Sequence, residues 1–259
     1  MPNKVVNRVT FLGTGTSQGV PVIGCDCPVC RSGDIHDRRL RSSILVEYDG
    51  LKFLVDAGPD FRQQMLRAGS PRPDAILLTH HHVDHTGGLD DVRALNHLEN
   101  RDFPIYCERN VEESLRKQFY YAFSSWKYPG APGFDIRTIT SNPFEIEGRK
   151  IIPIRAMHYK LPILGFRFGD FAYVTDANYI PESEFVKLEG LKLFVVNTVR
   201  RGKHISHFSL EEAVGVCKAV GAERSFLTHI SHLLPTHRDL SAELPSGILP
   251  AYDGLSVEF

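Results

Sequence analysis

The sequence contains no long hydrophobic segment. No run of about 18 consecutive apolar residues, the length that a membrane-spanning helix needs, occurs among its 259 residues. Residues 1–8 also lack the apolar core of a secretory signal peptide. These absences predict a cytoplasmic protein that does not associate with a membrane.

An excess of charge of either sign is also absent. The chain has 30 Lys and Arg residues against 31 Asp and Glu residues, and it has no long basic block. Proteins whose main affinity is for nucleic acid or for an anionic membrane usually carry such a block. Nucleic acid is therefore not an expected partner, whereas a local basic pocket and a homodimer both stay open.

No short-period repeat or low-complexity linker divides the chain. With 42% hydrophobic and 24% charged residues, the chain can bury one large core. We therefore expect a single domain over residues 1–259.

Short strand patterns outnumber helical patterns along the chain. Strands are expected at 8–12, 43–48, 51–56, 75–78, 104–107, 193–196, 225–227 and 255–259, with further strand-like runs between 144 and 174. Helices are expected at 90–98, at 111–123, near 181–188 and from Ser209, with a capping box, to Gly221. Asp49-Gly50 predicts a hairpin turn. The segment from Ser125 to Phe134, which holds the only Trp, is either a lid over a site or a packed surface loop.

The most informative segment follows the apolar run 75–78. Within six residues it offers three imidazoles and a carboxylate, from His80, His82, Asp84 and His85. A loop at the end of a rigid strand can direct several side chains to one point. The alternative is a His-rich surface loop, which rarely has this four-donor spacing. The pattern therefore predicts a metal site.

Three other strand patterns end in a similar way. Residues 151–157 lead to His158, residues 171–174 lead through Thr175 to Asp176, and residues 226–227 lead through Thr228 to His229. Strand ends that share one rim of a sheet can converge. Together these donors suit two divalent ions bridged by Asp176, with coordination positions left open for water, as in catalytic sites.

Three cysteines lie close together near the amino terminus. Because thiols stay reduced in the cytoplasm, Cys25, Cys27 and Cys30 are more typical of a Zn²⁺ site than of disulfides. A closed tetrahedral site needs a fourth ligand, and His232 is the best candidate. The alternatives are a Cys27/Cys30 redox pair or unused thiols. Two further cysteines, Cys107 and Cys217, stand in apolar segments and are expected to be buried.

At this point the chain resembles the metallo-β-lactamase superfold over essentially its whole length. The resemblance rests on residues 11–15 (FLGTG), residues 54–58 (LVDAG), the H-x-H-x-D-H core, and the later His158, Asp176 and His229 in the family's order. It implies an α+β or α/β fold, a four-layer αββα sandwich with a dinuclear site at one edge of two sheets. It also implies that Asp56 orients the metal loop, the alternative being a strand-end turn residue.

A narrower resemblance is to the phosphoribosyl 1,2-cyclic phosphate phosphodiesterases of the bacterial carbon-phosphorus lyase pathway. It rests on residues 13–21, the cysteine loop, residues 228–232 and His207, which lies 22 residues before His229. It implies that the thiolates and His232 hold a structural Zn²⁺ and that His207 is the general acid. One departure is that residues 193–196 end in Asn197, where an acidic residue is expected, so the substrate stays open.

The resemblance predicts a metal-dependent hydrolase of a small cyclic phosphodiester, of the phosphoribosyl 1,2-cyclic phosphate or 2′,3′-cyclic nucleotide type. Two cations, with Asp84 among their ligands, would activate a water as hydroxide, and His207 would protonate the leaving oxygen. His204 is the substitute acid, and a helix-capping role is the alternative for His207. Arg39 and Arg41 are either phosphate binders or solvated surface charges. Zn²⁺ or Mn²⁺ is favoured in the central site, and Fe or Ni also suits its donors.

Related functions fit less well. A transfer RNA 3′-processing nuclease carries a long arm between the positions matching His158 and Asp176, where this chain has 17 residues. A β-lactamase would need a signal peptide, and a glyoxalase-type thioesterase a helical domain after His229. A non-hydrolytic relative in quinone cofactor assembly shares the thiolate loop but has a degraded central site, whereas all seven donors are present here.

Overall fold

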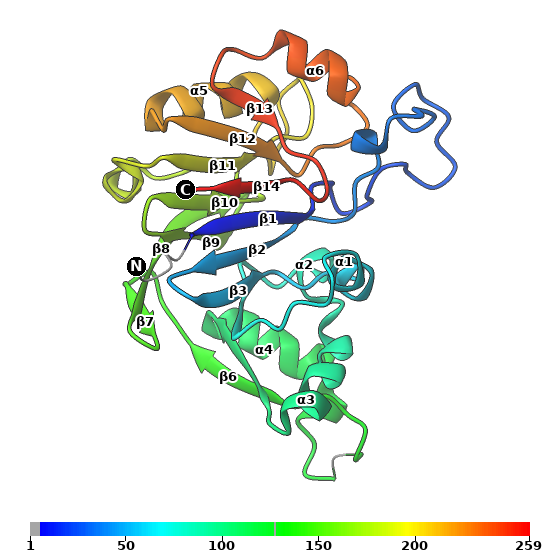
Figure 1. Ribbon diagram of the computed structural model, residues 1–259, viewed down its shortest axis with the longest axis vertical. Helices are drawn as coiled ribbons and strands as arrows, with labels where there is room; N and C mark the ends of the chain where they lie inside the picture. The colour runs from blue at the N-terminus through cyan, green and yellow to red at the C-terminus, as the bar shows by residue number, and fades with distance from the viewer. Residues whose placement is uncertain (1–5, 127) are drawn as a thin grey trace.

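The computed structural model describes residues 6–126 and 128–259. Most of residues 1–8, on which the expectation about a signal peptide rests, and residue 127 of the possible lid lie outside the described residues. The strands form two seven-stranded sheets that pack face to face (Figure 1). The first sheet has the order β14 (Ser256–Glu258), β1 (Arg8–Gly13), β2 (Ser43–Tyr48), β3 (Leu51–Val55), β4 (Ala75–Leu77), β5 (Phe103–Cys107), β6 (Phe134–Thr138). The second has the order β13 (Ile248–Pro250), β12 (Arg224–Thr228), β11 (Leu193–Asn197), β10 (Phe171–Val174), β9 (Leu161–Phe168), β8 (Arg149–His158), β7 (Phe144–Ile146).

Helices cover the outer face of each sheet (Figure 1). The first sheet is covered by α1 (Phe61–Arg67), α2 (Val83–Thr86), α3 (Arg93–Glu99) and α4 (Arg109–Gln118). The second is covered by α5 (Leu210–Val220) and α6 (His237–Glu243). Short 3-10 helices lie at η1 (Ile35–Asp37), η2 (Leu89–Val92), η3 (Tyr120–Ala122) and η4 (Glu182–Leu188). This arrangement confirms the predicted αββα sandwich.

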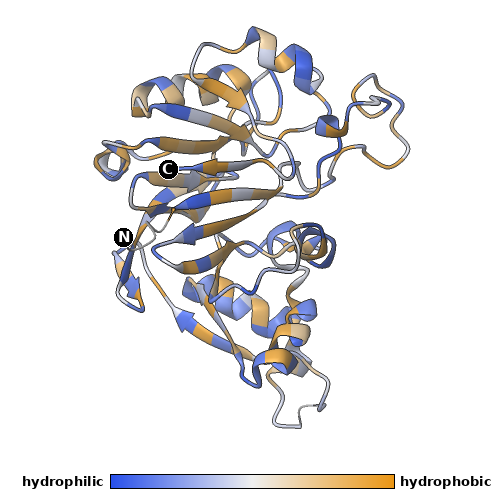
Figure 2. Cartoon of the chain, in the orientation of Figure 1, coloured by the Kyte–Doolittle hydropathy of each residue, from blue (hydrophilic) through white to orange (hydrophobic). Residues whose placement is uncertain are grey.

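Three hydrophobic clusters hold the four layers together. Between the sheets, Phe11 and Phe53 of the first pack with Phe166 and Phe168 of the second, all fully buried. A second cluster lies between the second sheet and α5, and a third between the first sheet and α1, α3 and α4. Figure 2 shows the apolar residues concentrated along the strands. Each large apolar side chain buried in this way contributes about 1.5–3 kcal/mol, so the sheet interface is a large part of what holds the fold.

The expected helix 111–123 is wrong at both ends. The helix α4 begins at Arg109 and ends at Gln118, and a 3-10 turn follows at Tyr120–Ala122. Phe119 leaves helical geometry, with φ −113° and ψ 40°, and its ring packs edge-on against Phe134 at 5.8 Å. Packing of the aromatic side chain onto the first sheet therefore outweighs the continuation of the helix.

Other local expectations differ from the structure by small amounts. The expected helix 90–98 starts as the 3-10 turn η2, the helix near 181–188 is 3-10 throughout, and the last strand is limited to Ser256–Glu258. The Ser209/Glu212 capping box is present, and Gly221 ends α5 with φ 67°. Asp49 and Gly50 both have positive φ, as the hairpin between β2 and β3 requires.

The described part of segment 125–134 is tied to α3. The amide of Asn96 donates to the Gly133 carbonyl and accepts from the Gly133 N–H, both at 2.9 Å. These contacts support the surface-loop alternative for this segment. Among residues 6–126 and 128–259, no helix is long and apolar enough to cross a membrane.

Candidate metal centre

The predicted donors meet at one edge of the sandwich. β8 and β10 both pair antiparallel with β9, and β10, β11 and β12 run parallel, so their carboxyl ends share one edge. The loop after β4 reaches this edge from the first sheet, where Leu164 N of β9 donates to Thr79 O at 3.0 Å. Donors from both sheets are therefore brought together.

The donor atoms form linked groups. The nitrogen and oxygen atoms of each group lie within 4.8 Å of one another, and the groups are His80, His82 and His158; Asp84, Asp176 and His229; and His80, His85 and Asp176. The third group joins the first two through shared members. All seven predicted central donors thus lie in one cluster, as two adjacent ions with a shared carboxylate would require.

Left-handed backbone at the strand ends turns the chain sharply into the site. Asp56, Asp176 and His229 have φ values of 63°, 61° and 55°. Such conformations are uncommon for residues other than Gly and cost on the order of 1–3 kcal/mol each. The packing of the surrounding fold compensates for this cost at two donors, Asp176 and His229, and at Asp56, which contacts a third.

Asp56 anchors the metal loop from beneath. Its fully buried carboxylate accepts from Thr79 N at 2.9 Å, from Thr79 Oγ1 at 2.8 Å and from His85 Nδ1 at 2.7 Å. The Nε2 atom of His85 is left facing the site, buried and without a hydrogen-bond partner among the described residues. This geometry matches the orienting role expected of Asp56.

Gly58 allows the same turn to pack tightly against the metal loop. A Cβ atom at this position would lie 2.0 Å from the Asp84 carbonyl oxygen. Beside it, Ala57 N donates to His85 O at 2.8 Å. Only glycine permits this approach, so residues 56–58 and the metal loop are fixed as one unit.

Two other imidazoles are oriented by groups that the sequence did not reveal. His158 Nδ1 donates to the Ser206 carbonyl at 2.8 Å, and His229 Nδ1 lies 3.2 Å from Ser42 Oγ. Ser42 is 187 positions from His229 in the chain. No local pattern could have found these contacts, because they depend on the tertiary fold.

The threonine before a ligand, which recurs in the sequence, has a structural reason. Thr79 Oγ1 lies 2.9 Å from His80 Nδ1, and Thr175 Oγ1 donates to Asp176 Oδ1 at 2.8 Å. In these two cases the hydroxyl holds the side chain of the next residue, whereas the buried Thr228 Oγ1, before His229, has no hydrogen-bond partner among the described residues. This recurrence was the one sequence signal for residues that support the donors.

Asn197 clamps the turn that carries Asp176. Its amide accepts from Ala177 N at 2.7 Å and donates to Ala177 O at 3.0 Å, and the side chain is fully buried. A carboxylate cannot donate the second of these bonds. The amide at this position therefore has a structural reason, although an acidic residue was expected there.

His207 also lies within the cluster. Its Nδ1 is 4.0 Å from Asp176 Oδ2 and has no hydrogen-bond partner in the described part of the chain. Burial lowers the pKa of His207 to about 3, against the opposing effect of Asp176. His204, the substitute acid, stands beside it with a ring separation of 5.1 Å.

The charge of the cluster suits divalent cations. Asp56, Asp84 and Asp176 are largely buried, and their ion-pair partners are histidines. Burial opposes protonation of His85, but the Asp176, Asp56 and Asp84 carboxylates raise its pKa well above the ordinary value. Three buried carboxylates around one imidazole, with Asp176 Oδ1 3.2 Å and Asp84 Oδ2 3.4 Å from His85 Nε2, form a donor set that a divalent ion would satisfy. The residues therefore fit bound metal.

The predicted thiolate site is assembled in a loop. Cys25, Cys27, Cys30 and His232 place their sulfur and nitrogen atoms within 4.8 Å of one another, and Cys25 Sγ is 3.2 Å from His232 Nδ1. The Cys30 backbone N–H lowers the pKa of Cys27 to about 6, whereas burial raises that of Cys30 to about 11. All three thiols are free, and the set suits one Zn²⁺.

The two arginines considered for phosphate binding have other partners. Arg39 is buried and donates to Thr14 Oγ1 and to the Ala251 carbonyl. Arg41 forms a two-oxygen ion pair with Asp60. Neither is a solvated surface charge of the kind expected as the alternative, and both are used to join loops.

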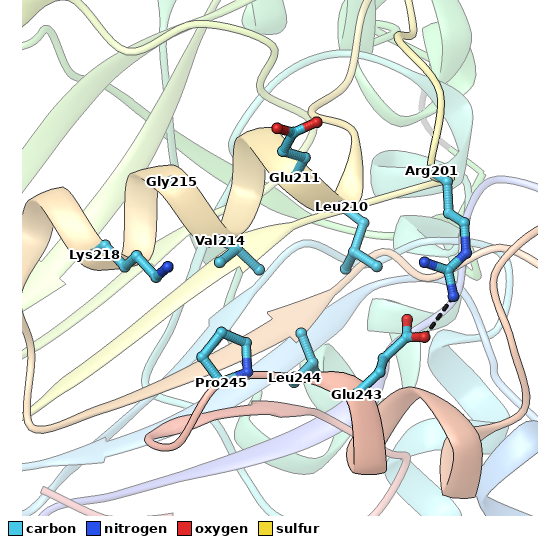
Figure 3. A pocket seen from close by; sticks show the side chains of 9 residues that line it. All are labelled: Arg201, Leu210, Glu211, Val214, Gly215, Lys218, Glu243, Leu244 and Pro245. Carbon is cyan, nitrogen blue, oxygen red and sulfur yellow. Dashed lines mark hydrogen bonds and ion pairs between the residues drawn. The ribbon is translucent and has the colours of Figure 1, made fainter.

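A separate hollow of about 510 Å³ lies between α5 and the α6–β13 loop (Figure 3). Leu210, Val214 and Leu244 line it, and the Arg201–Glu243 ion pair closes one end (Figure 3). Its lining contains none of the predicted donors.

Comparison with known families agrees with this geometry. The family described as the β-lactamase superfamily domain matches residues 52–230. The chain belongs to the β-lactamase superfamily. It is more particularly a PhnP-like protein, because a crystal structure described as a new diphosphatase from the PhnP family is 41% identical to it. The two structures superpose with a TM-score of 0.91, and the match covers 98% of this chain and 97% of the chain in the crystal structure.

Two curated relatives are longer than this chain. An octanoyltransferase of Porphyromonas gingivalis is 42% identical over 251 residues, which are 96% of this chain and 51% of the relative. Coenzyme PQQ synthesis protein B of Methylobacterium nodulans is 36% identical over 122 residues, 42% of this chain and 39% of the relative. The chain thus spans about half of the first relative's length.

Proposed function

We propose that the protein hydrolyses a small cyclic phosphodiester at the strand-end centre, with His207 as the general acid. The observation that carries the proposal is the position of His207, largely buried beside the donors His158 and Asp176, with an unpartnered Nδ1. A buried imidazole in that place can transfer a proton to a leaving group bound at the centre.

The central donors His80, His82, Asp84, His85, His158, Asp176 and His229 would hold two divalent ions, with Zn²⁺ or Mn²⁺ favoured. When bound, such a pair lowers the pKa of water to roughly 7 and neutralises phosphate oxygens. Cys25, Cys27, Cys30 and His232 would hold one structural Zn²⁺.

The protein's own residues would orient and protonate the substrate. Burial lowers the pKa of His207 to about 3 despite the Asp176 carboxylate 4.0 Å away, so the ring is neutral near pH 7 before a substrate binds. An anionic phosphodiester beside the ring would favour the protonated imidazole, since an opposite charge raises its pKa. The proton would then pass from His207 to the leaving oxygen as the P–O bond breaks, while Asp56 and Asn197 keep the donors in place.

A panel of substrates tests the proposal. Purified protein with quantified metals is assayed against ribose 1,2-cyclic phosphate, 2′,3′-cyclic nucleotides and bis-aryl phosphodiesters, and turnover of a cyclic diester is expected. A diphosphate is the second candidate class, because the PhnP-family neighbour is described as a diphosphatase. An octanoyl thioester covers the activity named for the longer relative. Thioester turnover without any phosphodiester turnover would overturn the proposal.

His207→Ala tests the acid. Loss of a general acid costs about 10²- to 10⁴-fold in rate, and metal content should stay unchanged. His204→Ala is the matched comparison, because His204 is the alternative acid with an adjacent ring, and it should keep its turnover if His207 is the acid. Equal turnover of wild type and His207→Ala would refute the assignment.

A further inference from the structure

One side of the metal centre is a continuous rim made by three segments. Met157 N donates to Tyr179 O at 2.8 Å, and Tyr159 N donates to Asn178 Oδ1 at 2.7 Å. Phe208 N donates to the Ala177 carbonyl at 2.8 Å, which ties the segment after His204 to the same place. Residues 157–159, 177–179 and 204–208 are therefore fixed side by side, next to His158, Asp176 and His207.

This rim exposes large apolar side chains. Tyr159 is 50% exposed, Tyr179 54% and Ile205 65%. Each stands within three residues of a member of the donor cluster. Exposed apolar groups gathered beside a polar site are typical of a ligand-binding surface.

Tyr159 is held there at a conformational cost. Its φ is 57°, which for a bulky side chain is a true outlier, and the Asn178 side chain caps its backbone N–H. Tyr159 and Lys160 form the two-residue turn between β8 and β9, where His158 pairs with Leu161, so this positive φ belongs to the hairpin that holds the ring next to His158. The Lys160 ammonium lies 5.3 Å from the centre of the Tyr159 ring, so a positive charge accompanies the aromatic face.

We propose that Tyr159 and Tyr179 bind a planar aromatic substituent of the substrate, such as a nucleobase, beside the phosphodiester. The inference rests on the proposed function, because a leaving oxygen protonated by His207 brings the organic part of the substrate to this rim. Aromatic side chains stack on any base, and Lys160 attracts the anionic ester.

The test compares two substrates with the same leaving group. Adenosine 2′,3′-cyclic phosphate and the 2,3-cyclic phosphate of methyl ribofuranoside differ in the base alone. Tyr159→Ala and Tyr179→Ala should raise KM for the adenosine compound by roughly 5- to 100-fold, the range for one stacked base, with kcat little changed. Neither variant should alter KM for the compound without a base. Tyr→Phe variants at both positions should retain the wild-type KM.

Tyr128→Ala is the matched control, because Tyr128 is 74% exposed and lies beside Asn96 and His97 rather than on the rim. It should leave both KM values unchanged. Calorimetric binding of adenosine 2′-monophosphate, compared with methyl riboside 2-phosphate, gives a readout independent of turnover. The same Ala variants should weaken binding of the nucleotide alone.

The outcomes separate the two proposals. If both cyclic compounds are hydrolysed and the Ala variants change neither or both KM values, the tyrosine subsite is refuted and the proposed function stands. If neither compound is hydrolysed, the proposed function fails for this substrate class. In that case the binding measurement decides. Equal affinity for the nucleotide and the riboside phosphate refutes the subsite. A preference for the nucleotide that is lost in the Ala variants supports the subsite.

Discussion

The strand-end centre and the thiolate loop differ in how much of their geometry the protein holds by itself. At the centre, Asp56 and His85 are fully buried and joined by a 2.7 Å contact, with further supports from both sheets. In the loop, Cys25, Cys27 and Cys30 are only partly buried. Their sulfurs contact His232 and two backbone N–H groups of the same loop, those of Val22 and Cys30. This difference predicts that the centre is shaped before an ion arrives, whereas the loop would gain much of its order from a bound ion.

The largest effect is expected at the carboxylate that links the central groups. Asp176→Ala should abolish detectable turnover and remove at least one central ion, because Asp176 shares one donor group with His80 and His85 and another with Asp84 and His229. Elemental analysis should still find the zinc of the thiolate loop. Asp170→Ala, in the turn between β9 and β10 where the carboxylate pairs with Lys192, is the control. Full activity of Asp176→Ala would contradict the bridging role.

A substitution in the thiolate loop tests the second region. Cys27→Ser should lower zinc content by about one ion per chain and reduce stability by several kcal/mol, since structural Zn²⁺ contributes folding free energy. Thermal unfolding and metal quantification measure the two effects. Asp26→Ala changes an exposed neighbour and should alter neither. Unchanged metal content in Cys27→Ser would argue for unused thiols or a redox pair instead.

A smaller effect is expected where a supporting residue is altered. Asn197→Asp keeps the shape but loses the donor to Ala177 O, so metal affinity or turnover should fall by about 10- to 100-fold. The fold should persist, as judged by circular dichroism. Asn142→Asp, on an exposed loop, provides the comparison. An unaffected Asn197→Asp enzyme would show that the clamp is dispensable.

The subtlest effect compares the two regions directly. After metal removal by a chelator, amide hydrogen exchange should rise in residues 22–31 and change little in β4 and β8. The strands keep their ladder hydrogen bonds without metal, whereas the loop has few. Equal loss of protection in both regions would mean that the centre is not preformed.

The donors could be predicted from the sequence because clusters of His and Asp that directly follow a strand are typical of metal sites. His80 to His85, His158, Asp176 and His229 each follow an apolar run, and parallel strands bring such ends together. Asp56 was found through the family resemblance. Ser42 and Ser206 could not be predicted, because each contacts a donor that is distant in sequence. The end of α4 was misplaced for a related reason, since the packing of Phe119 is a tertiary effect.

The pairing of β1 with β14 has a consequence for how this fold can be joined to others. Val9 pairs with Val257, and Phe259 N donates to Asn7 O, so the two described ends of the chain lie together. β1 runs from there toward Thr14, whose carbonyl meets Ile230 beside His229 at the far edge. A polypeptide joined after Phe259 would thus begin a strand length away from the metal centre and would leave the donors unaltered.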